Sequence, residues 1–221
     1  MQHRFRAILF DLDGTLVDTA PDLTRALNHV LALEGRPPIG VGAIRALIGD
    51  GARVLIERGM AATGAPASAA QLERRFDDFI DYYRQHIADE SLPFPAAAEV
   101  VASLAREARL AVCTNKPEEL SVRLLEAVGL ARLFAAVIGG DTLAVRKPHP
   151  GHLLGTLERI GVDRSDAVMV GDSRNDVESA RAAGIPAIVV SFGYTTVPPR
   201  ELGAERVIDS FAELPSALAT L

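Results

Sequence analysis

Five short, almost wholly apolar runs recur along the chain, and each ends at a polar or glycine-containing turn. They cover Ala7–Phe10, Leu110–Cys113, Ala135–Ile138, Ala167–Val170 and Ala187–Val190. Apolar runs of this length, without regular polar alternation, are typical of parallel strands that are covered on both faces. The pattern therefore predicts a central parallel sheet.

Segments with helical periodicity follow these runs. They cover Glu118–Val128, Pro150–Ile160, Asn175–Ala183 and Phe211–Leu218. An alternation of strands and helices predicts helices on both faces of the sheet, with right-handed crossovers. The fold class is thus α/β, with a doubly wound, mainly parallel, Rossmann-like sheet.

The alternation breaks once, between Phe10 and Leu110, where about 100 residues separate two strands although a crossover needs only about a dozen. The gap contains further helical patterns, at Pro21–Leu33, Val41–Ile48, Ala52–Met60 and Ser68–Ile87. We therefore expect a helical domain, residues 19–90, inserted after the first strand. Residues 1–18 and 91–221 would form the Rossmann-like core.

Composition narrows the class of protein. Of the 221 residues, 48% are hydrophobic and 24% are charged, as in ordinary globular proteins. No apolar run approaches the ~20 residues of a bilayer span, and the start lacks the apolar stretch of a signal peptide. We expect a cytoplasmic protein without a membrane partner. The net charge of −6 disfavours a nucleic-acid partner, and the single cysteine, Cys113, excludes a disulfide framework.

Carboxylate, hydroxyl, amide and ammonium side chains follow the ends of four successive predicted strands. They are Asp11, Asp13, Thr114, Asn115, Lys147, Asp172 and Asp176. Ligands of open parallel sheets bind outside the carboxyl ends of the strands, so these side chains are expected to meet at one edge. A lone aspartate at a strand end is commonly a helix cap, but caps alone do not account for all seven.

Four neighbouring carboxylates require a cation. Two like charges ~4 Å apart repel by about 4 kcal/mol at an effective dielectric constant near 20. Oxygen ligands without histidine or cysteine favour a hard ion, and Mg²⁺ is the expected one. With Mg²⁺ and Lys147 in place, the site approaches neutrality and can accept a phosphate dianion. Lys147 is one of only two lysines, the other being Lys116.

Four sequence motifs carry a resemblance. DLDGTLVD begins at Asp11, the pair Thr114–Asn115 follows the second predicted strand, Lys147 lies in KPHP, and GDSRND ends at Asp176. Together, and in this order, they resemble the motifs of the haloacid dehalogenase superfamily of phosphohydrolases. The resemblance extends over nearly the whole chain and implies that the helical insertion is the cap domain of that superfamily.

The resemblance also implies catalytic roles. Asp11 would be the nucleophile that forms an aspartyl phosphate, and Asp13 would be the general acid and base. Thr114 and Lys147 would hold the phosphoryl oxygens, and Asn115 would contact the substrate. Because Asp13 is present, the resemblance favours phosphate over halide chemistry. The cap has no lysine, which argues against the members that cleave phosphonates.

The same resemblance implies a Mg²⁺ site at the carboxylates of Asp11 and Asp172 and the backbone carbonyl of Asp13. Asp176 would be a further ligand or would lie just outside the ligand shell. The partner would be a small phosphorylated metabolite, and the chain would act as a monomer or homodimer.

Within the superfamily, the chain is most similar to bacterial enzymes that hydrolyse 2-phosphoglycolate. Gly49 and Gly51 form a turn that opens a helix in the cap, and Arg53 adds a cation in its first turn. A helix N-terminus attracts anions, so these residues are expected to receive the substrate's carboxylate. An ordinary helix–helix turn is the alternative. Other substrates remain open, namely a sugar phosphate, a nucleotide or pyrophosphate, as does a binding protein without turnover.

Two residues depart from the pattern of those enzymes. Asp50 stands where asparagine is common, and Ala96 stands where glycine is common. An acid at position 50 would repel an anionic substrate unless it points away or orients Arg53, and alanine restricts the backbone at position 96. Lys116, which follows Asn115, either adds positive potential to the site or is an ordinary surface lysine.

Overall fold

A six-stranded parallel sheet forms the centre of the molecule. The computed structural model describes residues 4–221. The strand order is β5-β4-β1-β6-β7-β8, and every neighbouring pair is parallel. The strands are β1 (Ala7–Phe10), β4 (Arg109–Cys113), β5 (Ala136–Ile138), β6 (Ala167–Gly171), β7 (Ala187–Val190) and β8 (Arg206–Ile208). The predicted parallel sheet is confirmed, with β8 as an additional edge strand.

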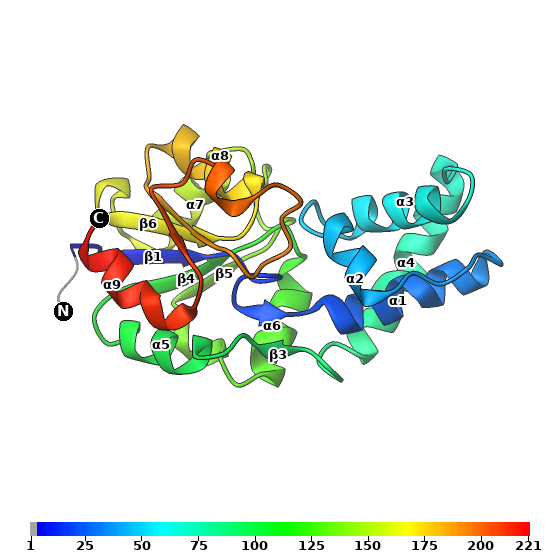
Figure 1. Cartoon of the computed structure of the whole chain (residues 1–221), viewed down its shortest axis with the longest axis horizontal. Helices are drawn as coiled ribbons and strands as arrows, with labels where there is room; N and C mark the ends of the chain where they lie inside the picture. Colours follow the sequence, from blue (N-terminus) through cyan, green and yellow to red (C-terminus); the bar gives the residue numbers. More distant parts are fainter. Residues whose placement is uncertain (1–3) are drawn as a thin grey trace.

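Helices cover both faces of this sheet (Figure 1). On one face lie α5 (Ala97–Leu104), α6 (Glu118–Ala127) and α9 (Leu214–Ala219), and on the other lie α7 (Gly151–Ile160) and α8 (Arg174–Ala183). Helix α5 was absent from the sequence prediction.

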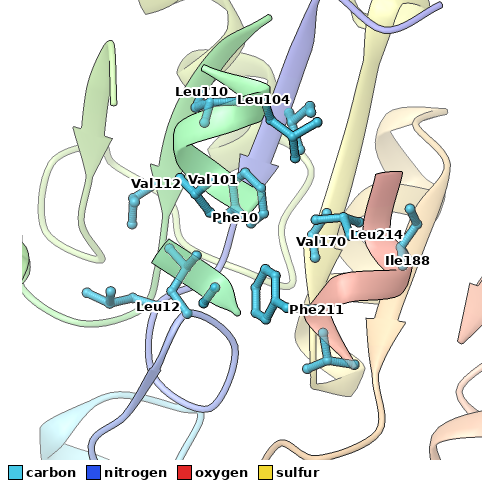
Figure 2. Close-up of a cluster of buried hydrophobic side chains, with 14 of the residues drawn as sticks. Phe10, Leu12, Val101, Leu104, Leu110, Val112, Val170, Ile188, Phe211 and Leu214 are labelled. Atoms are coloured by element: carbon cyan, nitrogen blue, oxygen red, sulfur yellow. The ribbon is translucent and has the colours of Figure 1, made fainter. Parts of the chain in front are cut away.

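The side chains of β1 alternate between the two faces, as the period of a strand requires. Ile8 and Phe10 belong to the hydrophobic cluster beneath α5 and α9, which Figure 2 shows around Phe10, Val170 and Phe211. Ala7 and Leu9 belong to the cluster beneath α7 and α8. All four are fully buried, so the strand that leads directly into Asp11 is packed on both faces.

Four helices form a separate group at one side of the sheet (Figure 1). They are α1 (Ala20–Leu33), α2 (Val41–Ile44), α3 (Ala52–Thr63) and α4 (Ala69–Gln85). Leu27, Ile56 and Phe79 are among the buried residues of their own hydrophobic cluster. The helix predicted over Val41–Ile48 is shorter than expected, because a 3-10 turn at Arg45–Leu47 replaces its second half.

A two-stranded antiparallel ribbon connects this helical group to the sheet. In it, β2 (Val17–Asp18) pairs with β3 (Leu92–Pro93). The ribbon places the segment that leads into the helical group beside the segment that leads back to the sheet. The division into a core and a helical domain at residues 19 and 90 stays a prediction.

The remaining regular elements are short 3-10 turns at Ala131–Leu133, Arg164–Asp166, Pro199–Glu201 and Phe211–Glu213. Throughout residues 4–221, the helices are either too short or too polar to cross a bilayer.

Candidate active site

The carboxyl ends of three adjacent strands supply the centre of the site. Asp11 follows β1, Thr114 follows β4 and Asp172 follows β6, and β1 lies between the other two. The three residues are 8%, 2% and 2% exposed. The sequence thus predicted correctly which strand ends meet, because neighbouring parallel strands end at the same edge of a sheet.

An acidic cluster lies at this edge. Asp11, Asp172 and Asp176 each place one carboxylate oxygen within 4.8 Å of the others. The ammonium of Lys147 lies 3.0 Å from Asp11 Oδ1 and 2.6 Å from Asp176 Oδ1. Three ionised carboxylates and one ammonium leave a formal charge of −2, so the cluster holds more negative charge than Lys147 offsets.

Burial sets the acid–base properties of the cluster. It raises the pKa of Asp11 to about 6, an effect that the charge of Lys147 opposes and that of Asp176 reinforces. Burial, followed by the charges of Asp176 and Asp11, raises the pKa of Asp172 well above its ordinary value. Burial lowers the pKa of Lys147, but Asp11 and Asp176 raise it by more. The carboxylates therefore need further positive charge to stay ionised together.

A divalent cation fits this donor set. All candidate ligand atoms are carboxylate oxygens, which hard cations such as Mg²⁺ prefer. The formal charge of −2 matches one such ion. Asp172 is well placed to be a ligand, because Thr15 Oγ1 donates to its Oδ1 at 3.0 Å and Tyr194 N donates to its Oδ2 at 2.6 Å. These contacts fix the carboxylate's orientation.

Asp176 also has a local task at the start of α8. Its Oδ2 accepts hydrogen bonds from the backbone N–H groups of Asp172 and Ser173, at 3.2 and 3.0 Å, and from the Ser173 hydroxyl at 2.6 Å. Its other oxygen pairs with Lys147. Asp176 therefore positions Lys147 and the helix N-terminus while it contributes charge to the cluster.

The side chain of Asp13 lies outside the acidic cluster. Its two oxygens lie 3.2 and 3.3 Å from the ammonium of Lys116, and that ammonium also donates to Tyr83 Oη at 2.8 Å. Lys116 is only 6% exposed. The alternative of an ordinary surface lysine is therefore wrong.

A cavity of about 40 Å³ adjoins these groups. It lies between the carboxyl edge of the sheet and the helical group, and Asp11, Asp13, Thr114 and Lys116 contribute to its polar wall. Gly49 and Gly51, which were predicted to contact substrate, also line it, together with the first residue of α3. Both glycines adopt positive φ angles, 120° and 89°, which a side chain would disfavour.

The structure does not bring Arg53 to this cavity. Its guanidinium donates to both carboxylate oxygens of Glu73, at 2.7 and 3.1 Å, and lies over the ring of Phe76. The side chain is 44% exposed. Although Arg53 is in the first turn of α3, that turn presents it to α4 rather than to the cavity.

Asn115, which was predicted to contact substrate, lines the small cavity and also contacts the turn at Gly49. Its amide nitrogen donates to the carbonyls of Gly49 and Lys147, at 3.1 Å each. Asn175 donates to the same Gly49 carbonyl at 3.2 Å and to Asp50 Oδ1 at 2.7 Å. These bonds dock the turn of the helical group onto the core.

The contacts of Asp50 show how its negative charge is compensated near a site for an anionic substrate. Its carboxylate accepts from Asn175 on the core and from Arg58 on α3. It is absent from the lining of the small cavity, although Gly49 and Gly51 on either side belong to it. The charge of Asp50 is thus paired with that of Arg58, although Asp50 and Asp13 both line a second cavity, of about 300 Å³.

Several residues of the site escaped sequence reasoning. Tyr83 belongs to an apolar helical stripe that is typical of a core, and Tyr194 follows the fifth predicted strand, a position that suits either packing or lining of the cleft. Two signals marked Lys116, namely the rarity of lysine and its position directly after Asn115. None of these signals shows which distant elements meet.

Comparison with known proteins agrees with this geometry. The family model described as haloacid dehalogenase-like hydrolase matches residues 8–190. The chain belongs to that family. A phosphoglycolate phosphatase from Caulobacter vibrioides is 52% identical over 97% of this chain and 91% of its own length. One from Agrobacterium fabrum is 48% identical over 95% and 91%.

A solved structure also resembles this haloacid dehalogenase-like hydrolase in its fold. The crystal structure of a predicted phosphoglycolate phosphatase from Haemophilus somnus has 30% sequence identity. It superposes with a TM-score of 0.91 over 97% of this chain and 98% of that one. The likeness covers the sheet and the helical group, so the whole fold is that of this hydrolase family.

Proposed function

We propose that this hydrolase converts 2-phosphoglycolate to glycolate and phosphate through an aspartyl phosphate on Asp11. The observation that carries the proposal is the position of Asp11. Its carboxylate lies 3.0 Å from the Lys147 ammonium and within 4.8 Å of carboxylate oxygens of Asp172 and Asp176, and it lines a small cavity to which Asp13 also contributes. The names of the relatives support the choice of substrate.

The first step would be attack of an Asp11 oxygen on phosphorus. A bond forms between Asp11 and phosphorus as the bond to the ester oxygen breaks. Asp13, in its protonated form, gives its proton to that oxygen, and glycolate leaves. Thr114 and Lys147 would hold the phosphoryl oxygens, since phosphoryl transfer depends mainly on positioning and charge stabilisation.

The second step would be hydrolysis of the aspartyl phosphate. Asp13, now a carboxylate, takes a proton from water, whose oxygen attacks phosphorus. Phosphate leaves, the Asp11 carboxylate is restored and Asp13 regains its proton. One side chain thus serves as acid and then as base.

Mg²⁺ would be held by Asp11 and Asp172, with the backbone carbonyl of Asp13 as a further ligand and Asp176 beside them. When bound, the ion offsets the negative charge of the carboxylates and of the phosphoryl group. Lys147 provides one positive charge at the same place, because Asp176 holds it 3.0 Å from Asp11.

The proposed role of residues 19–90 is that of a cap that encloses the substrate. The N-terminal end of α3, with Gly49 and Gly51, would face the substrate. The cavity's volume of about 40 Å³ has room for roughly three water molecules. The apolar side chains of its wall, Leu23, Leu55, Phe79 and Leu120, offer no partners to sugar hydroxyl groups and so favour a short acid over a sugar phosphate.

The proposal is tested by Asp11→Asn. We expect turnover of 2-phosphoglycolate in the presence of Mg²⁺ to fall by at least about 10⁴-fold, because an amide is a poor nucleophile. The variant should remain folded by circular dichroism. Trapping of a phosphorylated wild-type protein by rapid acid quench provides the matching positive observation. Near-normal turnover in the variant would refute the assignment of the nucleophile.

A further inference from the structure

A buried lysine and a buried tyrosine form one wall of the small cavity. Lys116 lies in the loop after β4, and Tyr83 lies on α4, so one comes from the core and the other from the helical group. We infer that Lys116 and Tyr83 together bind the carboxylate of the substrate and so determine specificity for a short phosphorylated acid. The inference rests on the proposed hydrolysis of 2-phosphoglycolate.

Lys116 supplies positive charge where a substrate's second anionic group would lie. It is 6% exposed, and among the described residues that line this cavity it is the single cation. Its ammonium lies within 3.3 Å of both Asp13 oxygens. A ligand whose ester oxygen reaches Asp13 therefore has its neighbouring atoms close to Lys116.

Tyr83 supplies a hydrogen-bond donor that lacks an acceptor. The side chain is 1% exposed. Its oxygen accepts from Lys116 at 2.8 Å, but within residues 4–221 its own hydroxyl hydrogen donates to no atom. Leaving a buried donor unpaired costs about 1–3 kcal/mol. A carboxylate has two oxygens, and Lys116 and Tyr83 offer one donor to each.

The rest of the cavity wall restricts the ligand's size and polarity. Beside the polar groups of Asn115 and the glycine turn, the wall is formed by Leu23, Leu55, Phe79 and Leu120, which offer no partners to the hydroxyl groups of a sugar. The volume of about 40 Å³ is that of a few water molecules. The apolar wall and the ammonium of Lys116 thus suit a tail that has few hydroxyl groups and carries an anion.

Arg53 had been expected to take this role, but Glu73 and Phe76 occupy its guanidinium on the exposed side of α3. The carboxylate-binding cation therefore comes from the core instead of the first turn of α3. The N-terminus of α3 still faces the same cavity through Gly51.

The test compares two substrates in two variants. In Lys116→Met, which keeps the length of the side chain and removes its charge, we expect kcat/KM for 2-phosphoglycolate to fall at least about 100-fold. For ethyl phosphate, which lacks the carboxylate, kcat/KM should also fall, because Lys116 contacts Asp13, but the fall should be at least about 10-fold smaller than for 2-phosphoglycolate. Tyr83→Phe should reduce kcat/KM for 2-phosphoglycolate about 10-fold and reduce that for ethyl phosphate by clearly less, because the removed hydroxyl reaches Asp13 only through Lys116. Arg123→Met, which alters an exposed arginine on α6, is the matched control and should change neither.

Each outcome decides the inference. An equal loss on both substrates, or no loss, would overturn it, since a structural role would affect both. If Lys116→Met does not fold, the substrate split in Tyr83→Phe decides alone, and its absence refutes the inference. If the wild type shows no preference for 2-phosphoglycolate, the proposed substrate fails first and the inference falls with it. A wild-type preference that survives in both variants refutes only the inference.

Discussion

Ala96 is a residue whose backbone conformation does not suit its side chain. It precedes α5 with a φ of 65°, in the left-handed region, and it is the one non-glycine residue with positive φ in the described part of the chain. An L-residue there costs roughly 1–2 kcal/mol. The sequence had marked position 96 because glycine is common there, and the structure gives the physical reason.

Replacing Ala96 with glycine is therefore expected to stabilise the protein. Relief of the strain exceeds the greater chain entropy that glycine has when unfolded, so we expect a gain of about 0.5–1 kcal/mol. Urea denaturation measures the free energy of unfolding directly. Ala98→Gly, two residues later inside α5, is the control and should be destabilising. A loss of stability in Ala96→Gly would contradict this account.

His152 couples the protein's stability to pH. It is fully buried on α7, and its Nε2 lies 3.1 Å from the Gly139 carbonyl, to which it must donate. Burial, and then the charge of Lys147, lowers its pKa to about 4. Between pH 6.5 and pH 4, His152 is protonated in the unfolded chain but stays neutral in the folded chain. The stabilising effect of neutral His152 is complete above pH 6.5 and is lost as the pH falls towards 4.

The corresponding prediction concerns His152→Gln, which keeps a donor but does not titrate. Between pH 7 and pH 5 the wild type should lose about 2 kcal/mol more of its free energy of unfolding than the variant. Chemical denaturation at the two pH values measures this difference. Equal losses in the two proteins would show that His152 is not responsible.

Among the elements, α1 owes its start to a side chain far away in the sequence. The Tyr194 hydroxyl accepts from the backbone N–H groups of Thr19 and Ala20, at 2.7 and 2.9 Å, and donates to Asp18 at 2.6 Å. The backbone N–H of Tyr194 donates to Asp172. One residue thus connects the acidic cluster with the N-terminal end of the first helix.

Tyr194→Phe should loosen this connection. It leaves the buried N–H of Thr19 without an acceptor, so we expect a loss of about 1–3 kcal/mol in the free energy of unfolding. Hydrogen exchange should become faster at the first turn of α1 and stay unchanged in β6. Uniformly faster exchange would instead indicate a general destabilisation without a local role.

The elements also show what the sequence could predict. The five apolar runs were found because strands buried on both faces carry no polar residues. Strand β8 escaped because it is three residues long and begins with Arg206. Helix α5 escaped because its alanines and valines give a weak polar face. The positions of Lys116 and Arg53 depend on packing between distant elements, which local patterns do not contain.

For the molecule as a whole, the uncompensated charge of the acidic cluster predicts a link between cation binding and stability. At Mg²⁺ concentrations about 100 times the dissociation constant, binding to the folded state adds about 2.7 kcal/mol. For a chain of this size that raises Tm by roughly 5–10 °C. Thermal scans with Mg²⁺ and with EDTA measure the shift. Asp172→Asn should reduce it strongly, and an unchanged shift in that variant would place the ion elsewhere.

The two-residue ribbon of β2 and β3 has a consequence for how such a chain diversifies. Because Asp18 is paired with Leu92, the segment between them is joined to the core by two connections that lie side by side. A recombination event could exchange this segment for an unrelated one without altering the order or register of the six-stranded sheet. The chemistry of the strand ends would be inherited intact while the choice of substrate was replaced in a single event. The pairing of a few residues thus allows this catalytic core to evolve by exchange of a whole inserted segment as well as by point mutation.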